Sequence, residues 1–132
     1  MIHSFRDLLV WQKGLSLAEC VYSVTEGLPR KEMYGLTTQM RRAAVSIPSN
    51  IAEGKGIGGR GYLRHLRIAL GSEAELQTQI ELAVRLKLLP KGDADKLLSE
   101  ASEVGRMLSS LLKSLLSQTR QADNPQPGGL TT

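Results

Sequence analysis

Residues 39–54 read Gln-Met-Arg-Arg-Ala-Ala-Val-Ser-Ile-Pro-Ser-Asn-Ile-Ala-Glu-Gly, a segment with helical spacing and a proline near its middle. Its apolar side chains, followed back to Leu36, recur every three or four residues, which predicts a helix with one face in a core. They are Leu36, Met40, Ala43, Ile47 and Ile51. Pro48 lacks a backbone N–H and is predicted to kink this helix. Gly54 is predicted to end it.

A second line along the same helix is polar at every step, and it predicts a structural cluster inside the bundle. Gly71-Ser72 forms a flat position in a later helix, where this polar line can pack closely. Arg42 is then expected to pair with Glu73 or Glu75. The predicted cluster consists of Arg42, Asn50, Glu53, Ser72 and Glu73.

The preceding helix, expected from Ser4 to Glu26, has two apolar sets on nearly opposite sides. One set consists of Leu8, Trp11, Leu15, Ala18 and Tyr22. A single bundle core covers only one set well, so the other is predicted to lie against a second copy of the chain. This predicted oligomer interface consists of Val10, Gly14, Leu17, Val21 and Val24.

The helix that contains residues 39–53 is expected to begin near residue 32. Two more helices are predicted after it, over residues 62–89 and about 93–117. The last one has the cleanest amphipathic repeat, with leucines in strict three-four alternation. Short connections make neighbouring helices antiparallel. The sequence therefore predicts an all-α, antiparallel up-and-down four-helix bundle over residues 1–117. Residues 118–132, which are rich in proline and glycine, are predicted to form a disordered tail.

Residues 54–61 contain five glycines and match the pattern G-x-G-x-x-G. The dinucleotide-binding motif requires a strand before this pattern, whereas a helix precedes it here. We expect a mobile interhelical loop. The alternative is a loop whose backbone amides, with Lys55 and Arg60, contact phosphate.

Basic residues are concentrated in one segment. The whole chain has a formal charge of +4, but residues 30–67 contain eight basic and two acidic residues. Such a patch attracts phosphate groups, and we name Arg41, Lys55, Arg60, Arg64 and Arg67 as candidate nucleic-acid-binding residues, with Arg30 and Lys31 as additional contacts. The alternatives are a solvated face or the binding surface for an acidic protein. With 4% aromatic residues, contacts to the nucleic-acid backbone are expected rather than base stacking.

Several function classes find no support in the sequence. Cys20 is the only cysteine, so we expect a buried thiol and no internal disulfide. His3 and His65 lack the spacing of a zinc or di-iron site, and His65 is expected at the surface. No recognisable nucleophile and base come together, so we expect neither catalysis nor a cofactor. No apolar run has the length of a membrane helix, and we expect a cytoplasmic protein that does not bind membranes.

The run at residues 39–54, with Val10-Trp11-Gln12 before it and residues 68–72 (Ile-Ala-Leu-Gly-Ser) after it, resembles the 23S rRNA-intervening sequence proteins, a family of four-helix bundles. The resemblance spans roughly Phe5 to Leu89. The family is in turn similar to the accessory variability determinant of diversity-generating retroelements, a basic pentameric barrel that works beside a reverse transcriptase and nucleic acid. The resemblance thus implies a ring of five copies, and it implies a function only weakly.

Together these observations predict a non-enzymatic, homo-oligomeric bundle that binds RNA or DNA through its basic patch. The alternative is an assembly adaptor that binds an acidic protein. A steep fall of affinity for mixed RNA and DNA with salt would distinguish nucleic-acid binding.

Overall fold

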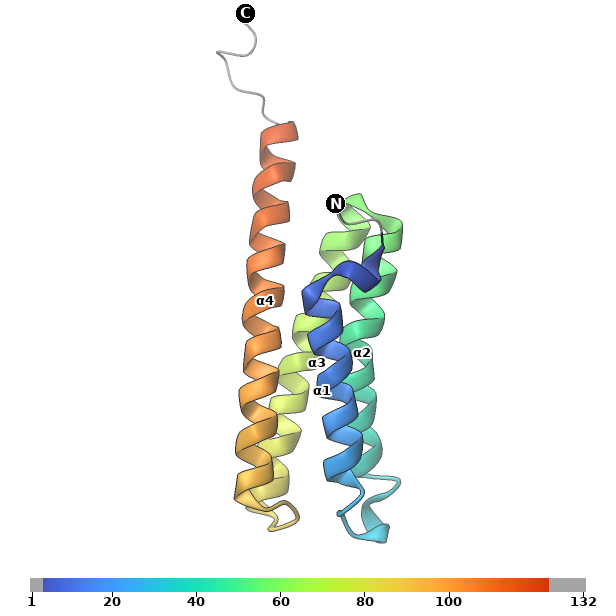
Figure 1. The fold of residues 1–132 in the computed structure, drawn as a ribbon, viewed down its shortest axis with the longest axis vertical. Helices are drawn as coiled ribbons and strands as arrows, with labels where there is room; N and C mark the ends of the chain where they lie inside the picture. The colour runs from blue at the N-terminus through green and yellow to red at the C-terminus, as the bar shows by residue number, and fades with distance from the viewer. Residues whose placement is uncertain (1–3, 124–132) are drawn as a thin grey trace, which may run out of the picture.

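Four long helices run alternately up and down and pack as one bundle (Figure 1) in the computed structural model, which describes residues 4–123. The helices are α1 (Leu9–Thr25), α2 (Leu36–Ile57), α3 (Gly59–Arg85) and α4 (Lys91–Asp123), with single 3-10 turns at Phe5–Asp7 and Arg30–Glu32. This architecture confirms the predicted all-α four-helix bundle.

The core consists of the apolar faces that the three-four spacing predicted. On α2, Met40, Ile47 and Ile51 are completely buried. They belong to one core cluster with buried leucines and isoleucines of α3 and α4, including Leu66, Ile80, Leu97 and Leu108. Each such side chain contributes roughly 1.5–3 kcal/mol when it is transferred from water, so this shared core holds the four helices together.

The glycine-rich connection between α2 and α3 is a tight turn, which corrects the expected mobile loop. The helix α2 continues to Ile57, Gly58 alone links the two helices, and α3 begins at Gly59. Gly58 and Gly59 have φ angles of 77° and 55°, in the left-handed region that only glycine adopts without strain. Two successive glycines therefore reverse the chain within a single linking residue.

The prediction that Gly54 ends α2 is wrong, because the helix continues to Ile57. Gly54 instead allows α3 to approach α2. A Cβ atom added at Gly54 would lie 2.8 Å from Cβ of His65 and 3.1 Å from the ring of Tyr62. Real Cβ contacts are longer than this, so only glycine fits without movement of the neighbouring helix. The two helices thus pack closely just before the tight turn.

The predicted oligomer interface on α1 is wrong, because these residues lie in the core of the chain itself. Val10, Gly14, Leu17 and Val21 are buried, and Val24 is partly buried against the core. Close approach at Gly14 involves α2: an added Cβ would lie 3.4 Å from Ile47 Cγ2 and 3.6 Å from Pro48 Cδ. The opposite set on α1 is the more exposed one, since Leu15 is 42% and Tyr22 44% exposed.

The last helix is longer than predicted and runs past the ends of α2 and α3 (Figure 1). It begins at Lys91, so Asp93 lies in its first turn rather than capping it, where a carboxylate still favours the helix dipole. Residues 118–123 are helical rather than part of a disordered tail. The remainder of the predicted tail, 124–132, lies outside the described residues, as does His3.

Candidate nucleic-acid interface

A chain of hydrogen bonds joins α2 to α3 at the place where the sequence predicted a polar cluster. The hydroxyls of Ser46 and Ser72 lie 2.8 Å apart. Asn50 Nδ2 donates to the backbone oxygen of Ser46 at 2.8 Å and to its hydroxyl at 3.0 Å. Because Ser72 is buried, these bonds supply partners for polar groups that lie between the helices.

His65 extends this chain of hydrogen bonds toward the tight turn between α2 and α3. Its Nδ1 lies 2.8 Å from Asn50 Oδ1 and 3.3 Å from Glu53 Oε2. Both partners are oxygen acceptors, so Nδ1 carries a hydrogen atom and donates it. His65 is 7% exposed, which corrects the expected surface position. Its neighbours in sequence gave no sign of these partners, because the partners come from α2 across the tight turn.

The structure brings three of the five predicted cluster residues together and places the other two elsewhere. Asn50, Glu53 and Ser72 belong to it, and Ser46 and His65 join them. Arg42 is exposed and makes no ion pair within the described chain. Glu73 is buried on another side of α3, toward α4, where Oε1 would be 2.7 Å from a Cβ added at Gly105, and Gln77 donates to its Oε2. A pair between Arg42 and Glu73 is excluded because the two side chains leave their helices in different directions.

Three of the candidate nucleic-acid-binding residues form an exposed line on the first turns of α3. Arg60, Arg64 and Arg67 are all exposed, and none forms an ion pair with a carboxylate of residues 4–121. Their spacing places them on one side of the helix, over about 10 Å of its axis. We call these three residues the α3 arginine line.

The charges around the α3 arginine line are all of one sign in the sequence. No acidic residue lies between Gly54 and Ser72, and the first turn of α3 has no acidic side chain and no side-chain cap. A helix N-terminus is itself positive, so a basic residue such as Arg60 in its first turn does not help the helix. The charges on these first turns therefore add little to the stability of α3.

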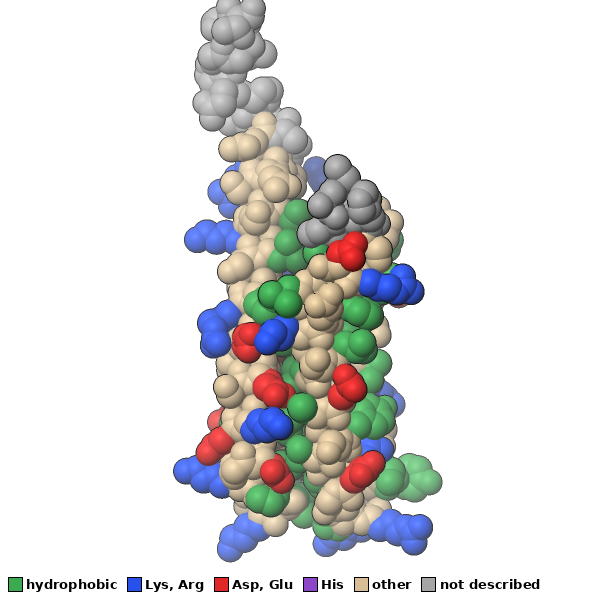
Figure 2. Space-filling model, viewed as in Figure 1, with side chains coloured by type: hydrophobic (Ala, Val, Ile, Leu, Met, Phe, Trp, Pro, Cys, Tyr) green, Lys and Arg blue, Asp and Glu red, His purple; other side chains and the backbone are tan. Residues whose placement is uncertain are grey.

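The face that Figure 2 shows, with α1 and α4, has a different character. Acidic and basic side chains are mixed along it, so neither sign dominates. An example is the pair Lys13–Glu103, whose Nζ and Oε1 lie 3.2 Å apart. The mixed face gives no comparable attraction for phosphate.

Arg41 and Lys55 do not extend the arginine line. Arg41 Nε donates to the Thr25 hydroxyl at 2.9 Å, and its guanidinium lies 4.5 Å from the centre of the Tyr22 ring. This places it beside α1, about 25 Å along α2 from the tight turn. Lys55 is half-buried, with its ammonium 5.8 Å from the Tyr62 ring. Both side chains therefore already have contacts within the chain.

Arg30 and Lys31 are exposed in the 3-10 turn between α1 and α2, at the opposite end of the bundle. Tyr34, close to them in the chain, is 96% exposed. The low aromatic content had predicted no exposed aromatic ring at a binding surface. These residues lie too far from the α3 arginine line to act at one site with it.

The polar chain shows no arrangement for covalent catalysis. Among the described residues, neither Ser46 nor Ser72 hydrogen-bonds to His65, so no base activates a hydroxyl there. No three His, Cys, Asp or Glu side chains of residues 4–121 come together as a metal site requires. Of the helices that the structure describes, none is long and apolar enough to span a membrane.

The family model of the 23S rRNA-intervening sequence proteins matches residues 6–110. The chain belongs to this family. A solved structure from the S23 ribosomal protein family, a protein of unknown function from Bacteroides thetaiotaomicron VPI-5482, is similar with a TM-score of 0.72. At 23% identity, the match covers 80% of this chain and 99% of that chain, and it shows a shared fold. No curated protein matches the sequence.

Proposed function

We propose that this family member is a non-enzymatic, homo-oligomeric protein that binds RNA or DNA through the α3 arginine line. The observation that carries the proposal is that Arg60, Arg64 and Arg67 are exposed on one side of α3 and free of ion pairs in the described chain. Guanidinium groups without a carboxylate partner are available to phosphate, for which their planar donors are well suited.

The site favours contacts to the nucleic-acid backbone. Arginines spaced along one side of a helix follow a line of phosphates, and such contacts carry affinity without reading sequence. The only Phe, Tyr or Trp side chain among residues 59–68 is Tyr62, which is buried. Base stacking at this site therefore has no exposed ring to use.

We place self-association on the exposed apolar residues of α1 and α2. Leu15, Tyr22 and Val45 are each 42–44% exposed, and they line two adjoining shallow depressions that share Tyr22 and Val45. Arg41 and Arg42 border one depression, and Glu19 and Glu26 border the other. A surface with apolar residues between opposite charges is suited to a second copy of the chain. The proposed self-association is tested by comparing the molecular mass of Tyr22→Glu with that of the wild type by light scattering.

The function is tested by fluorescence anisotropy with single-stranded RNA, single-stranded DNA and duplex DNA over a range of salt. We expect the wild type to bind with an affinity that falls steeply as salt rises. Replacing Arg60, Arg64 and Arg67 together by glutamate should abolish binding while circular dichroism stays unchanged, because exposed charges contribute little to folding.

A matched control changes three exposed basic residues elsewhere by the same charge. Arg106, Lys113 and Arg120 lie seven residues apart on α4, and their triple replacement by glutamate should weaken binding far less. Equal losses in both variants would point to net charge rather than to a site. If the wild type binds no nucleic acid at low salt, the proposal is wrong, and the basic patch is better explained by an acidic protein partner.

A further inference from the structure

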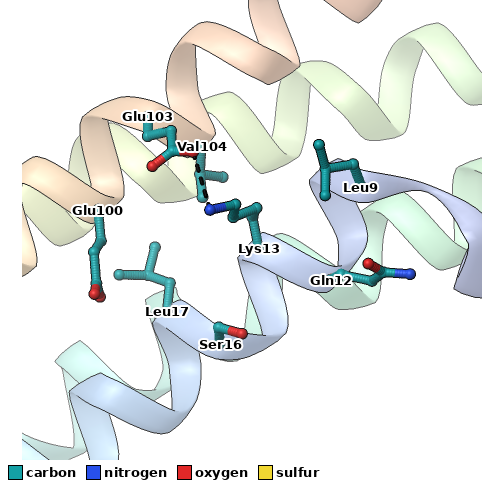
Figure 3. A pocket seen from close by; sticks show the side chains of 8 residues that line it. All are labelled: Leu9, Gln12, Lys13, Ser16, Leu17, Glu100, Glu103 and Val104. Carbon is teal, nitrogen blue, oxygen red and sulfur yellow. Dashed lines mark ion pairs between the residues drawn. The ribbon is translucent and has the colours of Figure 1, made fainter.

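A groove lies between α1 and α4 (Figure 3), and none of the α3 arginine line residues is among those that line it. It encloses about 320 Å³, near the lower end of the volumes that hold small molecules in proteins. Leu17 and Val104 form its apolar floor and are almost completely buried, while Leu9 is 58% exposed at its edge. The groove therefore offers an apolar surface for a short hydrocarbon chain.

The charged groups of the groove are unevenly paired. Lys13 Nζ lies 3.2 Å from Glu103 Oε1, which joins these two residues across the groove (Figure 3). Glu100 has no cationic partner in the described chain, although it lies in the same groove. The lining thus has one negative charge in excess.

One carboxylate oxygen of Glu100 also lacks a hydrogen-bond donor. This oxygen, Oε2, is buried and has no hydrogen-bond partner among residues 4–121, while the Cys20 thiol of α1 lies close enough for the carboxylate to raise the thiol pKa. A thiol is a weak donor and carries no charge. A buried carboxylate oxygen without a partner is unfavourable, and a cationic N–H donor is the group that satisfies it best.

We propose that this groove binds the ammonium group of a small aliphatic amine against Glu100, with the hydrocarbon chain of the amine along Leu9 and Val104. The proposal does not depend on nucleic-acid binding. Anions are disfavoured by the excess negative charge, and a neutral alcohol leaves the charge of Glu100 uncompensated. Lys13 does not take this place, because its ammonium is held by Glu103.

The direct test is calorimetric titration of the full chain with n-hexylammonium chloride, with 1-hexanol as the neutral compound of the same length. We expect saturable binding of the amine and at least about tenfold weaker binding of the alcohol. Glu100→Gln should weaken amine binding by about tenfold or more. Glu19→Gln removes the same charge from the exposed side of α1 and should leave binding unchanged. Equal affinity for amine and alcohol, or an unchanged affinity in Glu100→Gln, would overturn the proposal, as would no binding to the wild type.

Cys20 provides a second readout, because it is the only cysteine of the chain. Burial raises the pKa of its thiol, and the hydrogen bond to Glu100 and the charge of Glu100 raise it further; Glu19 adds to this effect and Lys96 opposes it. An ammonium at Glu100 compensates the carboxylate charge, so the amine should lower the thiol pKa, followed as thiolate absorbance against pH. Hexanol should not change it. If the amine binds to the wild type and leaves the thiol pKa unchanged, its ammonium is not at Glu100 and the proposal fails.

Discussion

The seam between α2 and α3 and the seam between α1 and α4 use polar residues in opposite ways. Between α2 and α3, Ser46, Asn50, His65 and Ser72 provide one another with hydrogen-bond partners. Between α1 and α4, Glu100 keeps a buried oxygen without a partner beside a groove of about 320 Å³. The α2–α3 seam thus fixes the positions of its helices through specific contacts, whereas the α1–α4 seam leaves room for an additional molecule.

The largest expected effect comes from Gly54, where α2 and α3 approach closely. In Gly54→Ala the new Cβ would be 2.8 Å from His65 Cβ and 3.4 Å from Tyr62 Cα, so the helices must move apart. We expect a loss of about 3 kcal/mol in the free energy of unfolding, measured by urea denaturation. Gly71→Ala is the matched control in α3: nothing lies within 4 Å of the added Cβ, and a gain of up to about 1 kcal/mol is expected. Similar effects at both glycines would mean that the seam is not tightly packed.

A smaller effect is expected from Asn50, which connects Ser46 to His65. Asn50→Ala removes the acceptor of His65 Nδ1 and the donor to the Ser46 hydroxyl, so it should cost about 2 kcal/mol. The neighbouring Ser49 is exposed, and Ser49→Ala should change stability by less than about 0.5 kcal/mol. If Asn50→Ala is as stable as Ser49→Ala, the polar chain does not hold the two helices together.

The smallest effect is expected on the other seam. Glu100→Gln removes the charge of a carboxylate that has one buried oxygen without a hydrogen-bond partner. Stability should change by no more than about 1 kcal/mol, toward a more stable protein. A loss of 2 kcal/mol or more in the same denaturation experiment would show that Glu100 has a structural partner, and the contrast between the seams would disappear.

Much of the fold was predictable because it depends on local spacing. The apolar repeat on α2, with Met40, Ile47 and Ile51, specified the buried face that the structure contains. For α1 the sequence showed two apolar sets but not which one faces the core, because that depends on how α2 approaches Gly14. The glycine-rich segment was wrongly predicted to be a mobile loop. Gly58 and Gly59 reverse the chain, whereas Gly54 and Gly61 lie within helices.

The site was predictable only in part, for a related reason. The α3 arginine line follows from spacing within one helix, and the structure places all three side chains in solvent. The partners of His65 come from another helix, so no pattern around His65 indicated them. Arg42 was assigned to Glu73 or Glu75 by charge alone, although the structure exposes Arg42 and turns Glu73 toward Gly105. Pairing across helices requires knowledge of their rotation about their own axes, which the sequence does not provide.

The single-residue link at Gly58 also bears on the order in which the chain folds. Ten residues connect α1 to α2 and five connect α3 to α4, so α2 and α3 have the least loop entropy to lose when they pair. We therefore expect the hairpin of α2 and α3 to form in the folding transition state, with α1 and α4 docking later. Kinetic φ-values for Ile51→Val and Leu66→Ala should then exceed those for Leu17→Ala and Val104→Ala, and the reverse order would refute this expectation. On this route the α3 arginine line is already in place before the groove between α1 and α4 exists.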